Sequence, residues 1–262
     1  MALVPRSFYM TETIQMRKYE KYALEGANFR ICSSQPKAIK STIRNQRKIL
    51  INYINRYPEF LKALHPLEPL PDAPEIAKRM HTASKKVGVG PMACVAGITA
   101  QFAAEAALRN GAEESIVENG GDIYLASNNE IVIGIYAQKS PLSGRIAFQV
   151  SPSLLPVAVC SSSSKMGHSL SFGNCDLASV LAPDAALADA AATQACNWVK
   201  GEDDINPTIE KIMPIEGIQG ILIIMNDKIG IAGNLPELIK FDDSAFAQKI
   251  TIDEKSNHTI CF

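Results

Sequence analysis

The chain has 262 residues, with 26 basic and 27 acidic side chains and a formal net charge of -1. Hydrophobic residues make up 47% and charged residues 20%, a balance that excludes an intrinsically disordered chain and a basic nucleic-acid-binding protein. A chain of this length can bury about 70–75% of its unfolded surface, so its core needs no disulfide or metal.

The N-terminal residues and the cysteines indicate the domain organisation and the cellular compartment. Leu3–Ser7 has the sequence of a thrombin cleavage site, so residues 1–7 are read as the remnant of an expression tag. We expect residues 8–262 to form a single domain, with two fused lobes as the alternative. The six cysteines form no Cys-x-x-Cys pair or zinc-type cluster, which predicts buried free thiols and a reducing, cytoplasmic location.

The first part of the chain predicts one hairpin followed by helices. Loose alternation around a Glu-Gly turn indicates the hairpin, and apolar residues at helical spacing follow it. The predicted elements are a hairpin over Met16–Ala23 and Ala27–Ser33, a helix over Ala38–Leu64 that Pro58 divides, and a short helix around Pro74–Lys85.

A long uncharged tract, Val87–Ala104, comes next. It approaches the length of a membrane span, but its glycines, Pro91 and Gln101 make it too polar for one. We therefore expect a helix that is buried inside a soluble protein, with Pro91 in its first turn and its end near Asn110-Gly111.

The remainder predicts strands, one alanine-rich helix and a final hairpin. The predicted strands are Ser115–Val117, Ile123–Leu125, Ile131–Ala137, Arg145–Val150, Val157–Cys160 and Leu177–Leu181. Asp184 is the expected N-cap of a helix over Asp184–Lys200. Ile218–Met225 and Lys228–Ala232 flank the turn Asn226-Asp227. Strands and helices do not alternate one for one, which favours an α+β fold.

The segment Gly88–Ala93 formally matches a dinucleotide-binding fingerprint. The fingerprint needs a hydrophobic strand directly before it, whereas residues 81–86 are polar and basic. Two interpretations stay open. Backbone N–H groups at the helix start could bind a phosphate, or the glycines serve close packing.

Glu118–Asp122, which reads Glu-Asn-Gly-Gly-Asp, lies between two predicted strands. Asn119-Gly120 first of all predicts a hairpin turn, because both residue types tolerate positive φ. The functional alternative is that Gly120 and Gly121 let the backbone approach a flat or phosphorylated ligand, while Asp122 holds a polar group of it.

A run of four serines, Ser161–Ser164, follows an apolar strand and precedes Lys165. Its hydroxyls form a donor surface suited to phosphate or to a carbonyl-rich ring, with Ser161, Ser162 and Ser163 as the candidate residues. Cys160 and His168 could instead act together as a thiolate pair. The structural alternative is a flexible polar loop.

Asp189 and Thr193 are four residues apart on the alanine-rich helix and share a face of it. A carboxylate and a hydroxyl are hard oxygen ligands of the kind that Mg²⁺ prefers, with phosphates and water completing its coordination. The neighbouring residues are almost all apolar, so this helix is expected to be buried. A buried carboxylate needs a hydrogen-bonding partner or a cation.

The order of these segments resembles the ApbE flavin-trafficking proteins, and most closely their uncharacterised (UPF) ApbE-like branch. The resemblance runs over nearly all of Met16–Ala232. The segments that carry it are Val89–Ala93 (Val-Gly-Pro-Met-Ala), Glu118–Ile123 (Glu-Asn-Gly-Gly-Asp-Ile), Gly167–Gly173 (Gly-His-Ser-Leu-Ser-Phe-Gly) and Ala182–Thr193, which contains Ala-Asp-Ala-Ala-Ala-Thr.

The resemblance implies an α+β fold of the ApbE type, T-fold-like, with mixed sheets and packed helices. It also implies distant kinship to the Mg²⁺-dependent FAD:protein FMN transferases, some of which hydrolyse FAD. On this basis Asp189 and Thr193 would bind the metal. The implied flavin-binding residues are Gly120, Gly121, Asp122, Ser161, Ser162, Ser163 and His168.

Two segments of the transferases are missing here, which opens an alternative. This chain has Gly90–Gly97 where the transferases carry a Lys-Gly pair, and a shorter segment around His168 where they carry His-x-x-Asp-Pro. The leading hypothesis is an FAD-binding protein that acts as a Mg²⁺-dependent FMN transferase or FAD pyrophosphatase, with an acceptor protein as partner. The alternatives are a non-catalytic flavin or nucleotide carrier or sensor, and a role in thiol metabolism. Nucleic acid and a membrane span are not expected.

Overall fold

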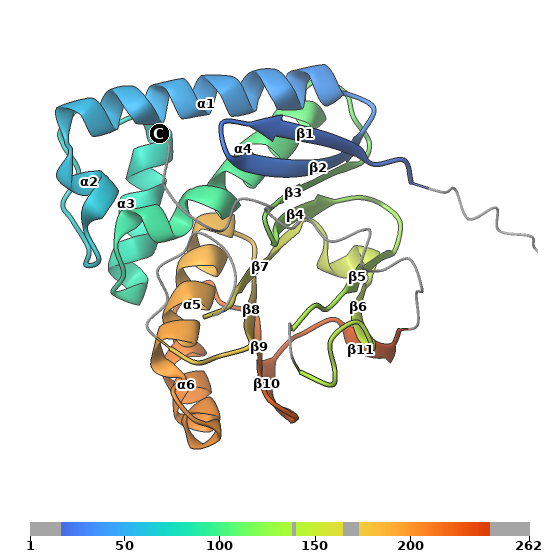
Figure 1. Cartoon of the computed structure of the whole chain (residues 1–262). Coiled ribbons are helices and arrows are strands. Elements are labelled where there is room, and N and C mark those ends of the chain that lie inside the picture. The colour runs from blue at the N-terminus through green and yellow to red at the C-terminus, as the bar shows by residue number, and fades with distance from the viewer. Residues whose placement is uncertain (1–16, 138–139, 165–172, 242–262) are drawn as a thin grey trace, which may run out of the picture.

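The computed structural model describes residues 17–137, 140–164 and 173–241. An eight-stranded sheet forms the centre, with the helices against one of its faces and a three-stranded sheet against the other (Figure 1). This architecture confirms the predicted α+β class. Two tracts of the chain, residues 20–126 and 157–233, supply the strands of the central sheet. Two strands of the small sheet lie between these tracts in the sequence, and the third follows them.

The large sheet is antiparallel throughout, with the strand order β1-β2-β3-β4-β7-β8-β9-β10. Its strands are β1 (Glu20–Leu24), β2 (Ala27–Ser33), β3 (Ser115–Asn119), β4 (Asp122–Ala126), β7 (Val157–Ser162), β8 (Leu177–Ala182), β9 (Gly220–Met225) and β10 (Lys228–Gly233). The small sheet has the order β11-β6-β5, with β5 (Ile131–Gly134), β6 (Ile146–Val150) and β11 (Glu237–Lys240).

The helices lie together on one side of the large sheet, with α4 between α1 and the strands (Figure 1). They are α1 (Pro36–Arg56), α2 (Glu59–Lys62), α3 (Glu75–Val87), α4 (Val95–Arg109), α5 (Ala185–Trp198) and α6 (Ile205–Ile212). Short 3₁₀ turns are η1 (Pro91–Cys94), η2 (Pro152–Leu154) and η3 (Glu202–Asp204).

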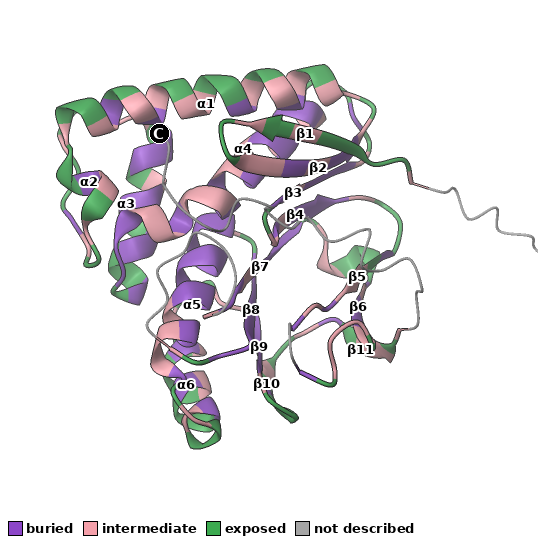
Figure 2. Cartoon of the chain, viewed as in Figure 1, coloured by how far each residue is buried: buried purple, intermediate pink, exposed green. Residues whose placement is uncertain are grey.

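The central strands are buried on both faces because the sheet separates two cores. On β7, Ala158 and Cys160 belong to the core beneath the helices, whereas Val157 and Val159 belong to the core beneath the small sheet. Successive side chains of a strand point to opposite faces, so a continuous apolar run is what a central strand needs. Figure 2 shows β7, β8 and β9 buried along most of their lengths.

Most predicted elements are confirmed, and their ends follow from capping chemistry. The helix predicted across Pro58 divides there, since α1 ends at Arg56 and α2 begins at Glu59. The carboxylate of Asp184 accepts a hydrogen bond from the Leu187 N–H at 3.0 Å and caps α5. The first strand begins at Glu20 rather than at the predicted Met16, and the strand predicted to reach Ala137 ends at Gly134.

One α-helix and one strand were not predicted. In α6, Pro207 occupies the first turn, where a missing N–H costs no helical hydrogen bond, so the proline does not prevent a helix. Strand β11 has only four residues and pairs with β6, which lies almost a hundred positions earlier in the chain. Neither pattern carries a local signal strong enough to be read in advance.

The helix that begins in the uncharged tract is an internal element of this fold. Pro91–Arg109 is long and apolar enough to cross a membrane by length and composition, with a mean hydropathy of 1.3, and 56% of that window is buried inside the protein. From Pro91 to Leu108 no side chain is exposed, and α4 packs against α1, α5, β3 and β4. The apolar surface is therefore covered by the protein's own helices and strands, as expected from the sequence.

A buried histidine joins two helices to the proline-rich connector between them. The Nδ1–H of His81 donates to the Leu67 carbonyl at 2.8 Å, and its Nε2 accepts from the Tyr53 hydroxyl at 3.0 Å. The Tyr53 oxygen in turn accepts from the Leu70 N–H at 3.1 Å. This arrangement needs a neutral imidazole, because Nε2 must act as an acceptor.

The network makes stability depend on pH. Desolvation lowers the pKa of His81 below its usual 6.5, outweighing the hydrogen bond to Leu67 and the charge of Glu68, which raise it. As the pH falls below about 6.5, His81 becomes protonated in the unfolded chain before it does so in the folded one. Proton binding therefore favours the unfolded chain and lowers the free energy of unfolding. Urea unfolding at pH 7.5 and 5.5 should show a larger loss for wild type than for His81→Gln. Equal losses would contradict this role.

Candidate functional site

The glycine pair forms a tight hairpin turn between β3 and β4. Asn119 pairs with Asp122 across the two strands, so Gly120 and Gly121 are the turn residues rather than the predicted Asn119-Gly120. Their φ angles are 63° and 108°, both in the left-handed region that a type I′ turn requires. A Cβ at Gly120 would meet no atom within 4 Å. The turn thus has open space over its backbone.

The turn fixes two polar residues that flank it. The Asp122 Oδ1 accepts a hydrogen bond from the Ser161 N–H on β7 at 3.2 Å. The Asn119 side chain donates to the Ala96 carbonyl, in the first turn of α4, at 3.3 Å. The hairpin is therefore tied both to the neighbouring strand and to the start of the helix above it.

Asp189 reaches the same place from α5. Its Oδ2 accepts a hydrogen bond from the Gly97 N–H at 2.9 Å, and the Ala96 N–H contributes a second one. These N–H groups belong to the first turn of α4, whose own N-cap residue, Cys94, makes no side-chain cap. Such N–H groups have no acceptor within their own helix. Asp189 thus caps α4 from a neighbouring helix.

Gly97 allows this approach. A Cβ at Gly97 would overlap the Ala185 carbonyl oxygen and lie 3.0 Å from the Asp189 Cβ. Gly97 lies outside the segment Gly88–Ala93, for which close packing was one interpretation; within that segment the packing role holds for Gly90, where a Cβ would lie 1.8 Å from the Ala63 carbonyl oxygen. The other interpretation was that a phosphate binds the N–H groups at the start of this helix. Two of these groups, those of Ala96 and Gly97, already donate to Asp189 and are not available to a phosphate.

The two aspartates are both buried, and the charge of one acts on the other. Asp122 is 6% exposed and Asp189 is 8% exposed. Burial raises the pKa of Asp122 well above its usual range, and the charge of Asp189 raises it further. Burial also raises the pKa of Asp189, against the two backbone hydrogen bonds that lower it. No lysine or arginine of the described residues offsets either desolvation.

The sheet divides the predicted serine surface between its two faces. The Ser161 hydroxyl is 2.6 Å from that of Ser179 on β8, on the face toward the small sheet. Ser162 shares the helix-facing side of β7 with Cys160, because alternate residues share a face. The Ser162 hydroxyl is buried and has no hydrogen-bond partner among the described residues, which costs about 1–3 kcal/mol unless a bound group supplies one. Ser163 is also buried.

Cys160 does not have the chemistry of a nucleophile. Its thiol lies 3.5 Å from the Ala185 carbonyl. Burial raises the pKa of this thiol well above its usual range, and Asp122 raises it further, so Cys160 stays protonated. The predicted thiolate pair also needs His168, which lies outside the described residues.

Five cysteines are buried and free, as predicted: Cys32, Cys94, Cys160, Cys175 and Cys196.

The donor set fits a hard divalent cation. Thr193 follows Asp189 by one turn of α5 and is 6% exposed. The described residues contain no cluster of three or more His, Cys, Asp or Glu side chains, which excludes an all-protein cage of that kind within them. Mg²⁺ is instead commonly bound through one or two carboxylates together with phosphate oxygens and water. Asp189, Asp122 and Thr193 match that requirement.

A second set of contacts, which the sequence did not reveal, holds the two helix starts together. The Gln101 Oε1 on α4 accepts from the Ala185 N–H at 2.8 Å and from Arg79 at 2.9 Å. Arg79 also pairs with Asp184 at 2.8 Å. Each helix therefore caps the other, because Asp189 serves α4 and Gln101 serves α5. A polar Gln101 within an apolar helix was the available signal.

Comparison with known sequences identifies close relatives. The family model described as AbpE bacteria matches residues 27–213. A UPF0280 protein of Methanococcus aeolicus is 42% identical over 208 residues, which cover 78% of this chain and 84% of that protein. The UPF0280 protein MJ1526 of Methanocaldococcus jannaschii is 40% identical over 224 residues, covering 83% of this chain and 88% of that protein.

Comparison with solved structures supports the fold. The ApbE protein of Thermotoga maritima is 15% identical, with a TM-score of 0.54 over 90% of this chain and 99% of that one. The flavin transferase ApbE of Vibrio cholerae has a TM-score of 0.48 at 14% identity, over 84% of this chain and 97% of that one. The likeness to the Thermotoga protein shows the fold that the sequence predicted.

Proposed function

The chain belongs to the AbpE bacteria family, and from this premise we propose that it binds FAD with Mg²⁺ and transfers or releases its FMN half. The ApbE-like fold supports a flavin-related function. The observation that carries the finer proposal is the Asp122–Asp189 pair, two desolvated carboxyls without a neighbouring cation among the described residues. A divalent cation bound by them would offset that desolvation.

Each part of the site has a role in this proposal. Asp189 and Thr193, with Asp122 opposite, would hold the cation. When bound, the cation neutralises the charge that develops on the pyrophosphate oxygens. Gly120 and Gly121 leave room for the flavin beside the turn, and the unpartnered Ser162 hydroxyl supplies a hydrogen-bond donor. The hydrogen bonds to Gly97 and Ser161 keep the two carboxyls in place.

The reaction breaks one pyrophosphate bond of FAD. In transfer, an acceptor hydroxyl forms a new bond to the FMN phosphorus and AMP leaves. In hydrolysis, water takes the place of the hydroxyl, and the products are FMN and AMP. Because the chain resembles FAD:protein FMN transferases, an acceptor protein is the proposed partner. The neutral surroundings of the site favour a nucleotide that is bound by one cation rather than by a basic patch.

A flavin carrier or sensor is the second candidate. The segment Gly90–Gly97 favours it, because the transferases carry a Lys-Gly pair there and this segment contains no lysine. The two candidates share the binding site and differ in turnover.

Incubation with FAD and Mg²⁺ separates them. Purified protein should release AMP and FMN, measured by chromatography, and the release should stop when EDTA removes the metal. FAD that binds but stays intact, also with cell extract as a source of acceptor protein, would assign the carrier function and overturn the catalytic one.

The serine run provides a matched pair of variants. Ser162→Ala removes a hydroxyl that is free to bind a ligand, so it should weaken FAD affinity about 5- to 10-fold, the value of one hydrogen bond of about 1–1.5 kcal/mol. Ser161→Ala removes a hydroxyl that Ser179 already engages on the other face, so FAD affinity should stay within about twofold. Fluorescence titration of FAD checks both, and a larger effect of Ser161→Ala would reverse the assignment.

A further inference from the structure

The outer edge of β10 is an apolar strand edge without a neighbour in the described part of the chain. Ile229 is 42% exposed and Ile231 is 56% exposed. From Ile229 to Pro236 the chain carries no charge. Unpaired, uncharged and apolar edges promote association with another strand, and monomeric proteins usually protect them.

The backbone of β10 presents its unpaired groups at these isoleucines. The two-residue turn Asn226-Asp227 makes Met225 and Lys228 a hydrogen-bonded pair. Hydrogen-bonded and non-hydrogen-bonded pairs alternate along an antiparallel ladder. Gly230 and Ala232 therefore bond to β9, while the N–H and C=O groups of Ile229 and Ile231 point outward. The Asn234 N–H, which donates to the Gln219 carbonyl at 2.7 Å, continues this alternation.

The opposite edge of the same sheet is protected. Strand β1 carries the charged Glu20 and Lys21, both exposed, and Lys40 from α1 forms an ion pair with Glu20. Charged side chains on an edge discourage pairing with another strand. Of the two edges of the large sheet, only β10 is thus open to association.

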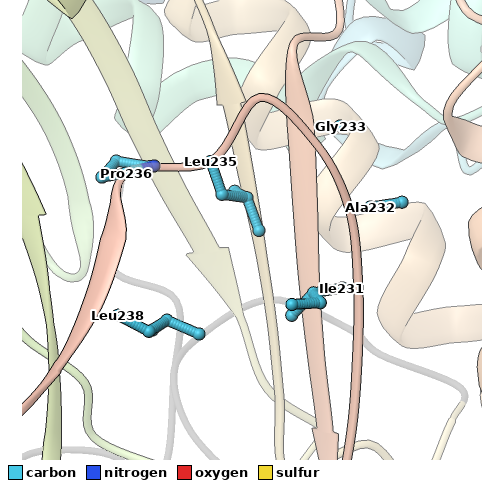
Figure 3. Close-up of a pocket in the computed structure, with 6 residues that line it drawn as sticks. All are labelled: Ile231, Ala232, Gly233, Leu235, Pro236 and Leu238. Carbon is cyan, nitrogen blue, oxygen red and sulfur yellow. The ribbon is translucent and has the colours of Figure 1, made fainter.

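An apolar groove adjoins the open edge. It has a volume of about 400 Å³ and is lined by Ile231, Ala232, Gly233, Leu235, Pro236 and Leu238. Figure 3 shows the side chains of Ile231, Leu235 and Leu238 pointing into the space between β10 and the chain that leads to β11. An occupant of this groove would therefore be apolar and would approach along β10.

We propose that the occupant is a second copy of this chain, paired antiparallel through β10 about a two-fold axis at Gly230. In this register Ile229 lies opposite the partner's Ile231, and Ile231 lies opposite the partner's Ile229. Both pairs join outward-pointing backbone groups, which gives about four hydrogen bonds between the copies. The same surface serves both subunits, as an isologous dimer requires.

The register also suits the other face of the strand. Gly230 meets the partner's Gly230 on the face covered by α6, where a Cβ would collide with Ile205. The sequence Ile229-Gly230-Ile231 reads the same in both directions. Each copy therefore offers the other the same side chains in this register.

The solution mass tests the dimer. Light scattering after size exclusion should give twice the 28.4 kDa of one chain. Ile231→Lys should shift the mass to that of one chain, because the ammonium would be buried between the strands. Val132→Lys is the matched control, since Val132 is 45% exposed on the edge strand of the small sheet, and it should leave the dimer intact. A monomeric wild type, or a dimer that survives Ile231→Lys, would overturn the proposal.

The register is tested independently by cross-linking. In a Cys261→Ser background, the double variant Ile229→Cys with Ile231→Cys should form covalent dimers on oxidation with a small disulfide. Each single variant should cross-link far less, because its sulfur faces an isoleucine. Efficient cross-linking by Ile231→Cys alone would place the axis at Ile231 and contradict the register. Loss of flavin binding would leave both results unchanged, so this test is separate from that of the proposed function.

Discussion

Replacing Asp189 by asparagine should reduce Mg²⁺-dependent release of AMP from FAD by at least about 100-fold. Removing a residue that only orients a metal ligand by a hydrogen bond lowers activity by up to about 100-fold. Removing the ligand itself should lower activity at least as much. The amide oxygen of asparagine can still accept from the Gly97 N–H, the bond that Asp189 makes at 2.9 Å. The fold should therefore survive while the charge is lost. The measurement is the AMP release rate as a function of Mg²⁺ concentration.

Asp184→Asn is the control for this variant. Asp184 lies at the start of the same helix and caps it, and asparagine is an equally good N-cap. The ion pair of Asp184 with Arg79 is partly exposed and contributes about 0–1 kcal/mol. AMP release should stay near that of wild type. If Asp189→Asn kept full activity, Asp189 would be a structural cap of α4 alone.

Replacing Gly97 by alanine should destabilise the protein, against the usual effect of that change. In a helix with free space, glycine to alanine stabilises by about 1 kcal/mol. Here the new methyl would overlap the Ala185 carbonyl oxygen, and all the nearby atoms are helix backbone or the Asp189 Cβ. Forcing apart two packed helices costs about 1–3 kcal/mol, occasionally more. After subtraction of the gain in helix propensity, urea unfolding should show a net loss of about 1 kcal/mol.

Gly201→Ala provides the comparison. Gly201 has a φ of −143°, in the range that any residue adopts, and a Cβ there would meet no atom within 4 Å. The free energy of unfolding should change by less than about 0.5 kcal/mol. If Gly97→Ala were as neutral as Gly201→Ala, the close approach of α4 and α5 would not be a constraint on the sequence.

Local chemistry explains what could be predicted from the sequence. Pro58 divides a helix because it lacks an N–H, and Asp184 begins one because its carboxylate accepts the Leu187 N–H. The expected burial of Asp189 also holds, because it followed from its alanine-rich neighbours. Each of these features depends on residues within about one helical turn.

Long-range geometry explains what could not be predicted. The Gly97 N–H and Asp189 are 92 positions apart, and no local pattern marks them as partners. Ser161 and Ser162 are adjacent with the same chemistry, yet the sheet places them on opposite faces. Ser179 engages the first, and the second has no partner in the described part of the chain. The open edge at β10 similarly depends on strand order, which alternation within one strand does not determine.

The most direct test of the proposed site is calorimetric titration of the wild-type protein with FAD, once with Mg²⁺ and once with EDTA. If Asp189, Thr193 and Asp122 hold a cation against the pyrophosphate, Mg²⁺ should tighten FAD binding by at least about tenfold, or 1.4 kcal/mol. Equal affinity under both conditions, or no binding in either, would contradict a metal-dependent flavin site at this pair of carboxylates.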